Sequence, residues 1–476
     1  MPSRRLSTPP LDFAAIRREF EVPEEFPPAA LTEAEEAAAS VALPAYDATA
    51  LPLVTLDPVG SRDLDQAMHL ARLGDGYRVS YAIADVSAFV PPGGALDEAT
   101  AERGVTVYCP DLRVPLHPPV LSEGAASLLP DQVCPAVLWQ IDLDAAGAVS
   151  TVDVRRAAVR SIAQLDYPAV QSTVDSGTAH ESLALLPEIG ALRLGLARQR
   201  HAIELNLPEQ EVMVDESGSW SLVFRAQLPV EIWNAQISLL TGICAAQLML
   251  AAGVGILRTL PEAPSGAVRR LRHLAPGLGV DWPESAHVGD VLAGLDPGQP
   301  RQAAFLEEAA SLLRGAGYAP FDGAAPDDPV HAAVAAPYAH VTAPLRRLVD
   351  RFGTEVCLAQ AAGTALPGWV RDRLPELPGQ LVAGDRRSRA VERAALDLAE
   401  AHLLAERVGA VFDAVVAEAE DDRAKIVLSD LAVRATCDGA GLTAGEELPV
   451  RLTEADPTQR RVRFVPAGAV ESPSRS

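Results

Sequence analysis

The chain has 476 residues, of which 48% are hydrophobic and 22% are charged, and its formal net charge is −24. This length and hydrophobic content suit two or three folded domains and exclude a chain that is disordered throughout. The acidic balance counts against a nucleic-acid partner, because phosphate contacts need Lys or Arg, unless the basic residues gather in a local channel.

The five cysteines lie far apart and form no C-x-x-C pair. A disulfide framework or a structural zinc site is therefore not predicted, and a reducing cytoplasm fits. The first ten residues, MPSRRLSTPP, lack the apolar stretch of a signal peptide. No uninterrupted apolar run reaches the roughly 18 residues that span a bilayer. We expect a soluble, cytoplasmic protein without membrane contact.

Predicted helices and strands follow one another without regular alternation. Residues 1–48 indicate a polar tail and two short helices, at 11–20 with Asp12 as N-cap and at 32–39. Strands are predicted at 51–57 and 77–90, and as a hairpin at 137–143 and 149–159 around the turn 144–147. Helices are predicted at 185–200, 230–252, 303–315 and 386–405. Strands early and helices late indicate an α+β core.

The last part of the chain predicts a second kind of domain. Five short strands are expected at 410–417, 424–428, 432–436, 448–453 and 460–465. So many short strands in so few residues are typical of a small closed barrel of the oligonucleotide-binding (OB) type.

The segment TLDPVGSRDLDQ, residues 55–66, gathers carboxylates at the end of a predicted strand. Asp57 ends the strand, and Asp63 and Asp65 alternate, so that both point to one side if the segment is extended. Converging carboxylates repel one another unless a cation neutralises them, and such oxygen-rich sites suit Mg²⁺ or Mn²⁺. An exposed acidic turn explains these residues equally well when they are considered alone.

A second segment, YAHVTAPLRRLVDR, places Arg346 and Arg347 at the start of a predicted helix, just after Pro344. A helix N-terminus favours an anion, and arginine holds phosphate through two parallel hydrogen bonds. Taken alone, such a pair is more often a solvated helix face. Together with the carboxylates it indicates metal-assisted phosphodiester chemistry, in which an arginine stabilises the pentavalent phosphate.

Four stretches, in the same order, resemble the ribonuclease II and ribonuclease R (RNB) family of exoribonucleases. They are TLDPVGSRDLDQA (55–67), YAIADVSAFVPPGGALDEATAERGVTVYCPDLRVPLHP (81–118), LSEGAASLLP (121–130) and HVTAPLRRLVD (340–350). The resemblance implies an RNB-type catalytic domain at 49–405, an S1-type OB barrel at 406–468 and a tail at 469–476. The helical segment at 1–48 is too short for the tandem cold-shock domains typical of the family.

The resemblance also implies roles for individual residues. Asp57, Asp63 and Asp65 match acidic active-site positions that, with position 66, would hold Mg²⁺, or Mn²⁺ in its place, and Asp65 would also hold the 3′-terminal nucleotide. Arg346 matches the arginine that stabilises the transition state. Further matches concern RNA: Tyr167 would stack on the terminal base, Tyr108 would line the RNA path, and Thr342 and Arg347 would contact RNA. Taken alone, either tyrosine is more often a half-buried packing residue.

Several positions depart from the family pattern. Gln66 replaces the second of two adjacent aspartates, and its amide oxygen can ligate Mg²⁺ but adds no charge. We therefore expect weaker metal binding, a greater preference for Mn²⁺, or impaired activity. Leu205 stands where the family often has a stacking phenylalanine, Gln236 where it has a ribose-contacting glutamate, and Ala343 where it has a serine.

The resemblance implies a metal-dependent 3′→5′ exoribonuclease that degrades single-stranded RNA, processively, to nucleoside 5′-monophosphates. It implies no protein partner and requires only a monomer. The alternative is a catalytically weak or silent RNA-binding relative in which Gln66 has removed the metal chemistry. A third interpretation is an acidic scaffold for protein partners. Retention of the three aspartates and Arg346 favours the enzyme.

Overall fold

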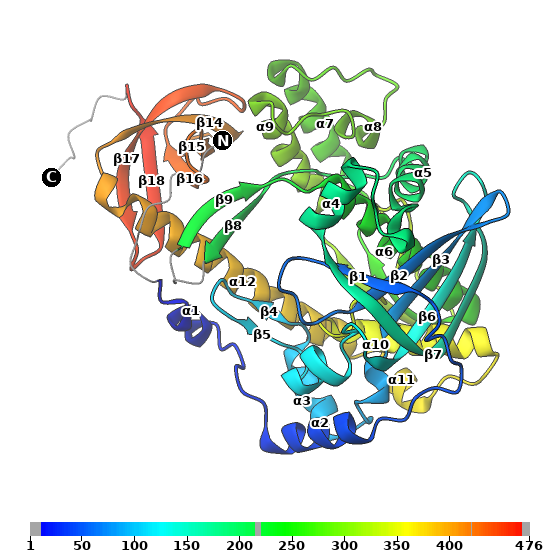
Figure 1. Cartoon of the computed structure of the whole chain (residues 1–476). Coiled ribbons are helices and arrows are strands. Elements are labelled where there is room, and N and C mark those ends of the chain that lie inside the picture. The colour runs from blue at the N-terminus through cyan, green and yellow to red at the C-terminus, as the bar shows by residue number, and fades with distance from the viewer. Residues whose placement is uncertain (1–10, 215–219, 420, 469–476) are drawn as a thin grey trace.

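Two closed barrels lie at opposite ends of the molecule, and the long helix α12 (Leu377–Leu404) runs between them (Figure 1). The computed structural model describes residues 11–214, 220–419 and 421–468. The polar tail expected at the N-terminus and the tail expected at 469–476 lie outside this part. The architecture is mixed α+β, as the sequence predicted.

The first barrel joins its strands in the order β1-β2-β3-β6-β7. Neighbouring strands are antiparallel, except that β1 and β7 pair in parallel and close the barrel. The strands are β1 (Leu53–Asp57), β2 (Gln66–Leu73), β3 (Gly76–Ala84), β6 (Val133–Leu143) and β7 (Val149–Asp166). The predicted hairpin around the turn 144–147 is confirmed as β6 and β7.

Two details of this barrel differ from the sequence-based expectation. Strand β3 ends at Ala84 instead of residue 90, because the 3-10 turn η1 (Val86–Ala88) follows it. Strand β2 was missed, since its sequence QAMHLARL contains no β-branched or aromatic residue and favours a helix. Pairing with β3 along its whole length overrides that preference.

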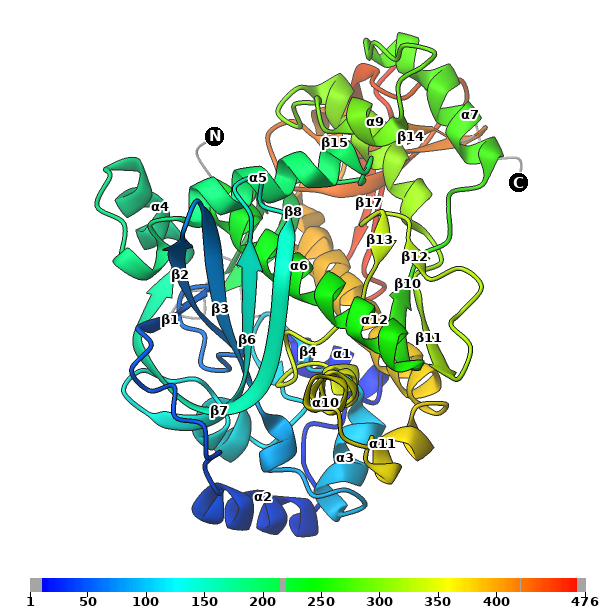
Figure 2. The same cartoon turned by 90° about the vertical axis from the view of Figure 1, so that its right-hand side faces the viewer.

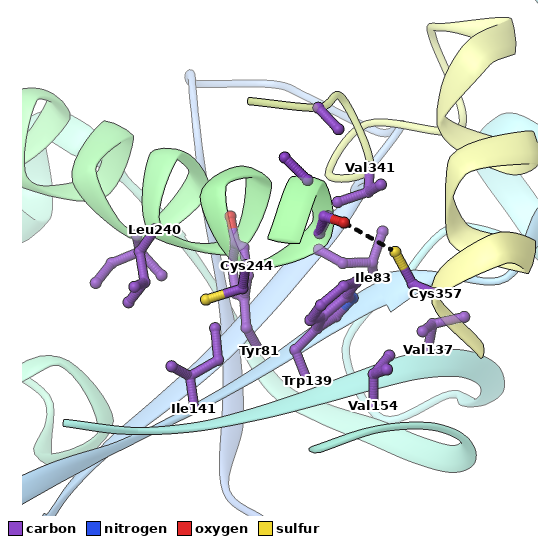
Figure 3. Close-up of a cluster of buried hydrophobic side chains, with 14 of the residues drawn as sticks. Tyr81, Ile83, Val137, Trp139, Ile141, Val154, Leu240, Cys244, Val341 and Cys357 are labelled. Atoms are coloured by element: carbon purple, nitrogen blue, oxygen red, sulfur yellow. Dashed lines mark hydrogen bonds between the residues drawn. The ribbon is translucent and has the colours of Figure 1, made fainter. Parts of the chain in front are cut away.

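Helices α6 (Pro229–Ala252) and α10 (Leu348–Ala362) pack against the first barrel. Figure 3 shows Leu240 and Cys244 of α6 above Tyr81 and Trp139 of the barrel strands, with Cys357 of α10 beside them. Because side chains alternate along a strand, the neighbours of Tyr81 in β3, such as Ala82, belong to a second buried cluster instead. The core is therefore divided between the two faces of the same strands.

One helix of the described residues, α6, is long and apolar enough by length and composition to cross a membrane. Its uncharged polar residues interrupt the apolar run, which is why the sequence showed no such segment. Just over half of its most apolar window, 56%, is buried inside the protein. It packs against α5 (Leu186–Gln199), α10 and β10 (Val254–Thr259), so its apolar character is explained by its place in the core.

The remaining elements surround this core (Figures 1 and 2). The helices are α3 (Ala95–Arg103), α4 (Tyr167–Asp175), α7 (Ser265–Leu274), α8 (Val288–Leu292), α9 (Pro300–Ala309) and α11 (Gly368–Arg373). The two-stranded sheets are β4 (Val107–Tyr108) with β5 (Arg113–Val114), β8 (Glu209–Val214) with β9 (Trp220–Arg225), β10 with β11 (Gly317–Asp322), and β12 (Val330–His331) with β13 (Ala336–Pro337). Short helical turns are η2 (Leu121–Ala125), η3 (Glu181–Leu183), η4 (Ala275–Leu278), η5 (Ala310–Leu313) and η6 (Ala405–Arg407).

The C-terminal barrel confirms the predicted five-stranded OB-type domain. Its strands close in the order β14-β15-β16-β18-β17. They are β14 (Val411–Ala419), β15 (Arg423–Leu428), β16 (Arg434–Asp438), β17 (Glu447–Asp456) and β18 (Arg461–Pro466). Each overlaps the strand expected from the sequence, with ends shifted by a few residues.

The N-terminal segment supplies two helices, α1 (Phe13–Glu19) and α2 (Pro28–Ser40). Asp12 caps α1 as predicted, since its side chain accepts a hydrogen bond from the Ala15 amide at 3.2 Å. Helix α2 starts earlier than expected, because Pro28 is well tolerated in the first turn of a helix. Helix α1 packs against α12 and the β4–β5 hairpin, and α2 packs against α3.

Candidate active site

Asp57 is the last residue of β1 and lies half-buried at the end of the barrel. Its Oδ2 is buried and has no hydrogen-bond partner among the described residues. Burial, together with the nearby charge of Asp63, raises the pKa of Asp57 to about 7, against an opposing effect of Arg346. A carboxylate in this environment is stabilised by a cation that replaces its proton.

Asp63 lies in the loop between β1 and β2 and is bound by the β4–β5 hairpin. Its Oδ1 accepts a hydrogen bond from Arg113 Nη1, and its Oδ2 accepts a long one, 3.4 Å, from the Tyr108 hydroxyl. Arg113 also donates to Glu123 at 2.6 Å, so its guanidinium joins two carboxylates. Sequence reasoning missed Arg113. The Pro-Asp turn between Tyr108 and Arg113 was the one signal that could have paired them across a hairpin.

Asp65 is almost completely buried, with 4% of its surface exposed. Its Oδ1 accepts a hydrogen bond from the Leu345 amide at 2.7 Å, and its Oδ2 lies 3.7 Å from Arg346 Nε. Burial raises the pKa of Asp65 well above its usual range, although Arg346 and the Leu345 amide act in the opposite direction. Asp63 and Asp65 thus contact different parts of the protein, and β2 begins only after them.

The two adjacent arginines have different environments. The sequence predicted that Arg346 and Arg347 begin a helix. Helix α10 instead begins at Leu348, so Arg346 lies in the turn before it. The Arg346 side chain is 46% exposed and can reach a ligand. Arg347 instead donates to both carboxylate oxygens of Asp350, at 2.8 and 2.9 Å, and makes a long contact of 3.5 Å with the Thr342 hydroxyl. Contact of Arg347 and Thr342 with RNA stays a prediction.

The two tyrosines lie near the carboxylates. Tyr108 is 47% exposed, and its hydroxyl approaches Asp63. Tyr167 begins α4, and its hydroxyl accepts a hydrogen bond from Asn234 Nδ2 at 3.0 Å. Burial and the nearby charge of Asp57 raise the pKa of Tyr167 to about 12, so the hydroxyl stays protonated at neutral pH. Each hydroxyl thus has a polar partner, which is close for Tyr167 and distant for Tyr108.

Leu205 and Gln236 contact neither the carboxylates nor the tyrosines in the hydrogen bonds and clusters of the described residues. Leu205 packs against the apolar cluster formed by α7, α9 and their connections. Gln236 is 5% exposed, and its Nε2 donates to Glu204 at 3.0 Å. Their predicted roles in RNA binding stay predictions.

Gln66 is the first residue of β2, and both ends of its side-chain amide are bound. Its Nε2 donates to the Thr342 carbonyl at 2.6 Å, and its Oε1 accepts from the Tyr81 hydroxyl at 2.5 Å. Ser238 makes a longer contact with the same oxygen, at 3.5 Å.

The carboxylates suit a divalent cation in chemical type, and the partnerless Asp57 oxygen is a free ligand position. The other candidate ligands already accept hydrogen bonds: Asp63 from Arg113, Asp65 through Oδ1 from the Leu345 amide, and Gln66 from Tyr81. Among the described residues, Asp65 Oδ2 faces only Arg346 Nε, 3.7 Å away. Within the described ranges, no group of three or more His, Cys, Asp or Glu residues is arranged to hold a metal ion. Asp57 therefore offers a free oxygen to a metal ion, whereas the oxygen of Gln66 already accepts a hydrogen bond. The roles of Asp57, Asp63, Asp65 and Gln66 as metal ligands stay predictions.

Two families of known proteins match this chain. The RNB domain matches residues 45–352, and the RNase II-type exonuclease C-terminal S1 domain matches residues 410–467. Ribonuclease R of Vibrio cholerae is 28% identical over 324 residues, which cover 64% of this chain and 38% of that protein. Ribonuclease R 1 of Lactococcus lactis is 25% identical over 392 residues, which cover 76% and 46%. The chain spans less than half the length of these relatives.

Solved structures match over most of the chain. RNase R of Mycoplasma genitalium, solved in complex with ribose-methylated single-stranded RNA, has a TM-score of 0.84 at 19% identity and covers 96% of this chain and 77% of that chain. Yeast Ssd1, described as a pseudonuclease, has a TM-score of 0.69 at 14% identity and covers 88% and 53%. At these identities the likeness concerns the fold alone.

Proposed function

Because the chain belongs to the RNB-domain family, whose ribonuclease R and exoribonuclease 2 members are its homologues, we propose that it is a 3′→5′ exoribonuclease acting on single-stranded RNA. The observation that carries the proposal is the meeting of Asp57, Asp63 and Asp65 with the half-exposed Arg346 at one end of the barrel. Carboxylates that face an arginine in this way suit the hydrolysis of a phosphodiester.

In the proposed reaction, water attacks the phosphorus of the last phosphodiester. The attacking water loses a proton to solvent, the bond from phosphorus to O3′ breaks, and O3′ takes up a proton. The terminal nucleotide then leaves with its 5′-phosphate. Arg346 would stabilise the charge that develops on the phosphoryl oxygens. Enzymes of this family are generally metal-dependent. A bound Mg²⁺ or Mn²⁺ would acidify the attacking water and neutralise the leaving oxygen, and Asp57 would be its principal ligand here.

The RNA would reach this site past Tyr108 and Tyr167. Stacking of bases on aromatic rings is tolerant of sequence and contributes about 1–3 kcal/mol per base. The C-terminal barrel is of a type that binds nucleic acid. The site and the C-terminal barrel lie on one chain, so we propose a monomer. We also propose that it releases nucleoside 5′-monophosphates processively.

A second candidate function is RNA binding without catalysis. It is favoured by Arg113, which neutralises Asp63, and by Gln66, whose oxygen is bound to Tyr81. Both reduce the capacity of the site to hold a metal ion. Against it stand the partnerless oxygen of Asp57 and the exposed guanidinium of Arg346, which a silent site does not require.

The test uses a 5′-labelled, unstructured RNA of about 30 nucleotides, with Mg²⁺, Mn²⁺ or EDTA, read on a denaturing gel. A short 5′-end fragment that accumulates only with metal, and without a ladder, is expected for a processive 3′ exonuclease. RNA that stays intact in all three mixtures but shifts on a native gel would support the silent binding protein. RNA that neither shifts nor shortens at low salt would leave neither function standing.

A further inference from the structure

The side chain of Gln66 has a fixed orientation. The Thr342 carbonyl can only accept a hydrogen bond, so the Gln66 nitrogen must face it, 2.6 Å away. The Gln66 oxygen then faces the Tyr81 hydroxyl, 2.5 Å away, and Ser238. Tyr81 is fully buried on a barrel strand beneath α6 (Figure 3).

These contacts occupy the oxygen of Gln66 on the side of Tyr81. The Tyr81 hydroxyl has one hydrogen, which it donates to this oxygen at 2.5 Å. The Tyr81 oxygen in turn accepts from the Ser238 hydroxyl, 2.9 Å away, so that Ser238, Tyr81, Gln66 and the Thr342 carbonyl form one part-buried chain of hydrogen bonds. A metal ion that replaced the Tyr81 hydroxyl at Gln66 would break this chain and leave Tyr81 with Ser238 as its remaining partner among these contacts, so metal binding there would cost a hydrogen bond.

The other end of the side chain holds the turn that carries Arg346. Successive residues of this turn are each fixed by a different partner. The contacts are Ala343 N to Asp350 Oδ1 (2.7 Å), Pro344 O to His117 Nε2 (3.1 Å), Leu345 N to Asp65 Oδ1 (2.7 Å) and Arg346 O to Thr106 N (3.0 Å). Gln66 fixes the first peptide group of this series, through the Thr342 carbonyl.

We propose that Gln66 is a positioning residue, which ties β2, β3 and α6 to the Thr342–Arg346 turn and so fixes Arg346 opposite the carboxylates. In this role Gln66 is not a metal ligand. The proposal rests on the exoribonuclease function for its kinetic consequence, but not for its structural one. The amide explains why an acidic residue would serve poorly here, since a carboxylate has no hydrogen to donate to the Thr342 carbonyl.

Two substitutions in the full chain separate the roles. Gln66→Glu keeps the length and adds a charge. If residue 66 is a metal ligand, this variant should bind Mn²⁺ more tightly. If residue 66 is a positioning residue, the new carboxylate should repel the Thr342 carbonyl and release the turn. Gln66→Met removes both hydrogen bonds. Gln171→Met is the matched control, because Gln171 also uses both ends of its amide, to Asp175 and to the start of α6.

The primary measurement is hydrogen exchange, followed by mass spectrometry of the peptide that contains residues 342–346. Exchange of the Ala343 and Leu345 amides should become about 5- to 30-fold faster in both Gln66 variants and stay unchanged in the control. Tyr81→Phe should also make these two amides exchange faster. It replaces the Gln66 variants in the test if those variants do not fold. Unchanged exchange in the variants that fold would overturn the proposal.

The secondary measurements are Mn²⁺ binding by calorimetry and RNA turnover. Gln66→Met should keep the wild-type Kd for Mn²⁺ while kcat falls about 100-fold, as expected when a catalytic group is misplaced. Mn²⁺ affinity that falls more than about tenfold in Gln66→Met, or rises in Gln66→Glu, would identify a ligand and overturn the proposal. An inactive wild type would refute the proposed function, whereas the exchange result would still decide the role of Gln66.

Discussion

Asp65 accepts a hydrogen bond from the Leu345 amide at 2.7 Å, which joins the carboxylate loop to a turn 280 residues further along the chain. Asp65 therefore has two roles: it accepts the hydrogen bond that holds this turn, and it supplies a carboxylate to the site. One substitution can separate them. Asn at this position keeps an oxygen for the Leu345 amide and removes the negative charge.

Asp65→Asn is expected to lower RNA hydrolysis by at least about 100-fold, while the melting temperature and the Kd for RNA stay close to those of the wild type. Single-turnover rates and fluorescence anisotropy measure the two effects. Asp65→Ala, which also removes the acceptor, should lower the melting temperature. If Asp65→Asn abolished RNA binding as well, the residue would be mainly structural.

Arg346→Ala is expected to lower kcat far more than RNA affinity, because the guanidinium acts on charge that develops during the reaction. Loss of one such donor typically costs about 2.7–4 kcal/mol of transition-state stabilisation. Steady-state kinetics and direct binding measurements separate the two parameters. Arg346→Lys should restore part of the rate, since it keeps the charge without the fork of donors. A change confined to the Kd would mean that Arg346 only positions the phosphate.

Arg17 braces the hairpin that carries Tyr108. Arg17 is 4% exposed, and its Nη1 lies 2.7 and 2.9 Å from the two carboxylate oxygens of Asp111, in the β4–β5 turn. Asp111→Ala leaves Arg17 with Glu24, 3.1 Å away, and is expected to reduce the free energy of unfolding by about 1–3 kcal/mol. It should also weaken RNA binding, because Tyr108 loses its support.

A double-mutant cycle checks that link. Asp111→Ala should weaken RNA binding in the wild type but have no further effect in a Tyr108→Ala background, since the stacking that it supports is already lost. Denaturant unfolding and anisotropy give the two readouts. Equal losses of RNA affinity in both backgrounds would contradict a role that acts through Tyr108.

The sequence predicted those elements that depend on residues close together in the chain. The apolar strands, the long helices and the C-terminal barrel were predicted from short-range periodicity, and the family resemblance brought Asp57 and Arg346 to one site. Strand β2 was missed because its helix-forming composition is overridden by pairing. The hydrogen bonds of Gln66 with Thr342 and of Arg113 with Asp63 join segments that are far apart in the chain. The spacing of residues in the sequence does not predict such contacts, because they depend on how the segments pack.

Glu400 of α12 provides a test of pH dependence away from the site. Its Oε1 accepts hydrogen bonds from the Arg434 amide at 2.7 Å and from Gln210 at 2.6 Å, which joins α12 to the C-terminal barrel and to β8. Burial raises the pKa of Glu400 from 4.5 to about 7, although both hydrogen bonds act in the opposite direction. The folded state therefore holds a proton that the unfolded state releases at lower pH.

The sign of the effect follows from this difference. The contribution of Glu400 to stability is fully present below about pH 4.5 and is lost as the pH rises through about 7. Glu400→Gln keeps an oxygen for both donors and cannot ionise. Above pH 7 it should exceed the wild type in free energy of unfolding by on the order of 2 kcal/mol. Thermal unfolding between pH 5 and pH 8 should thus give a flatter profile for the variant, whereas the exposed Glu392→Gln on the same helix should follow the wild type. Parallel profiles for wild type and Glu400→Gln would show that Glu400 is ionised in the folded protein across this range.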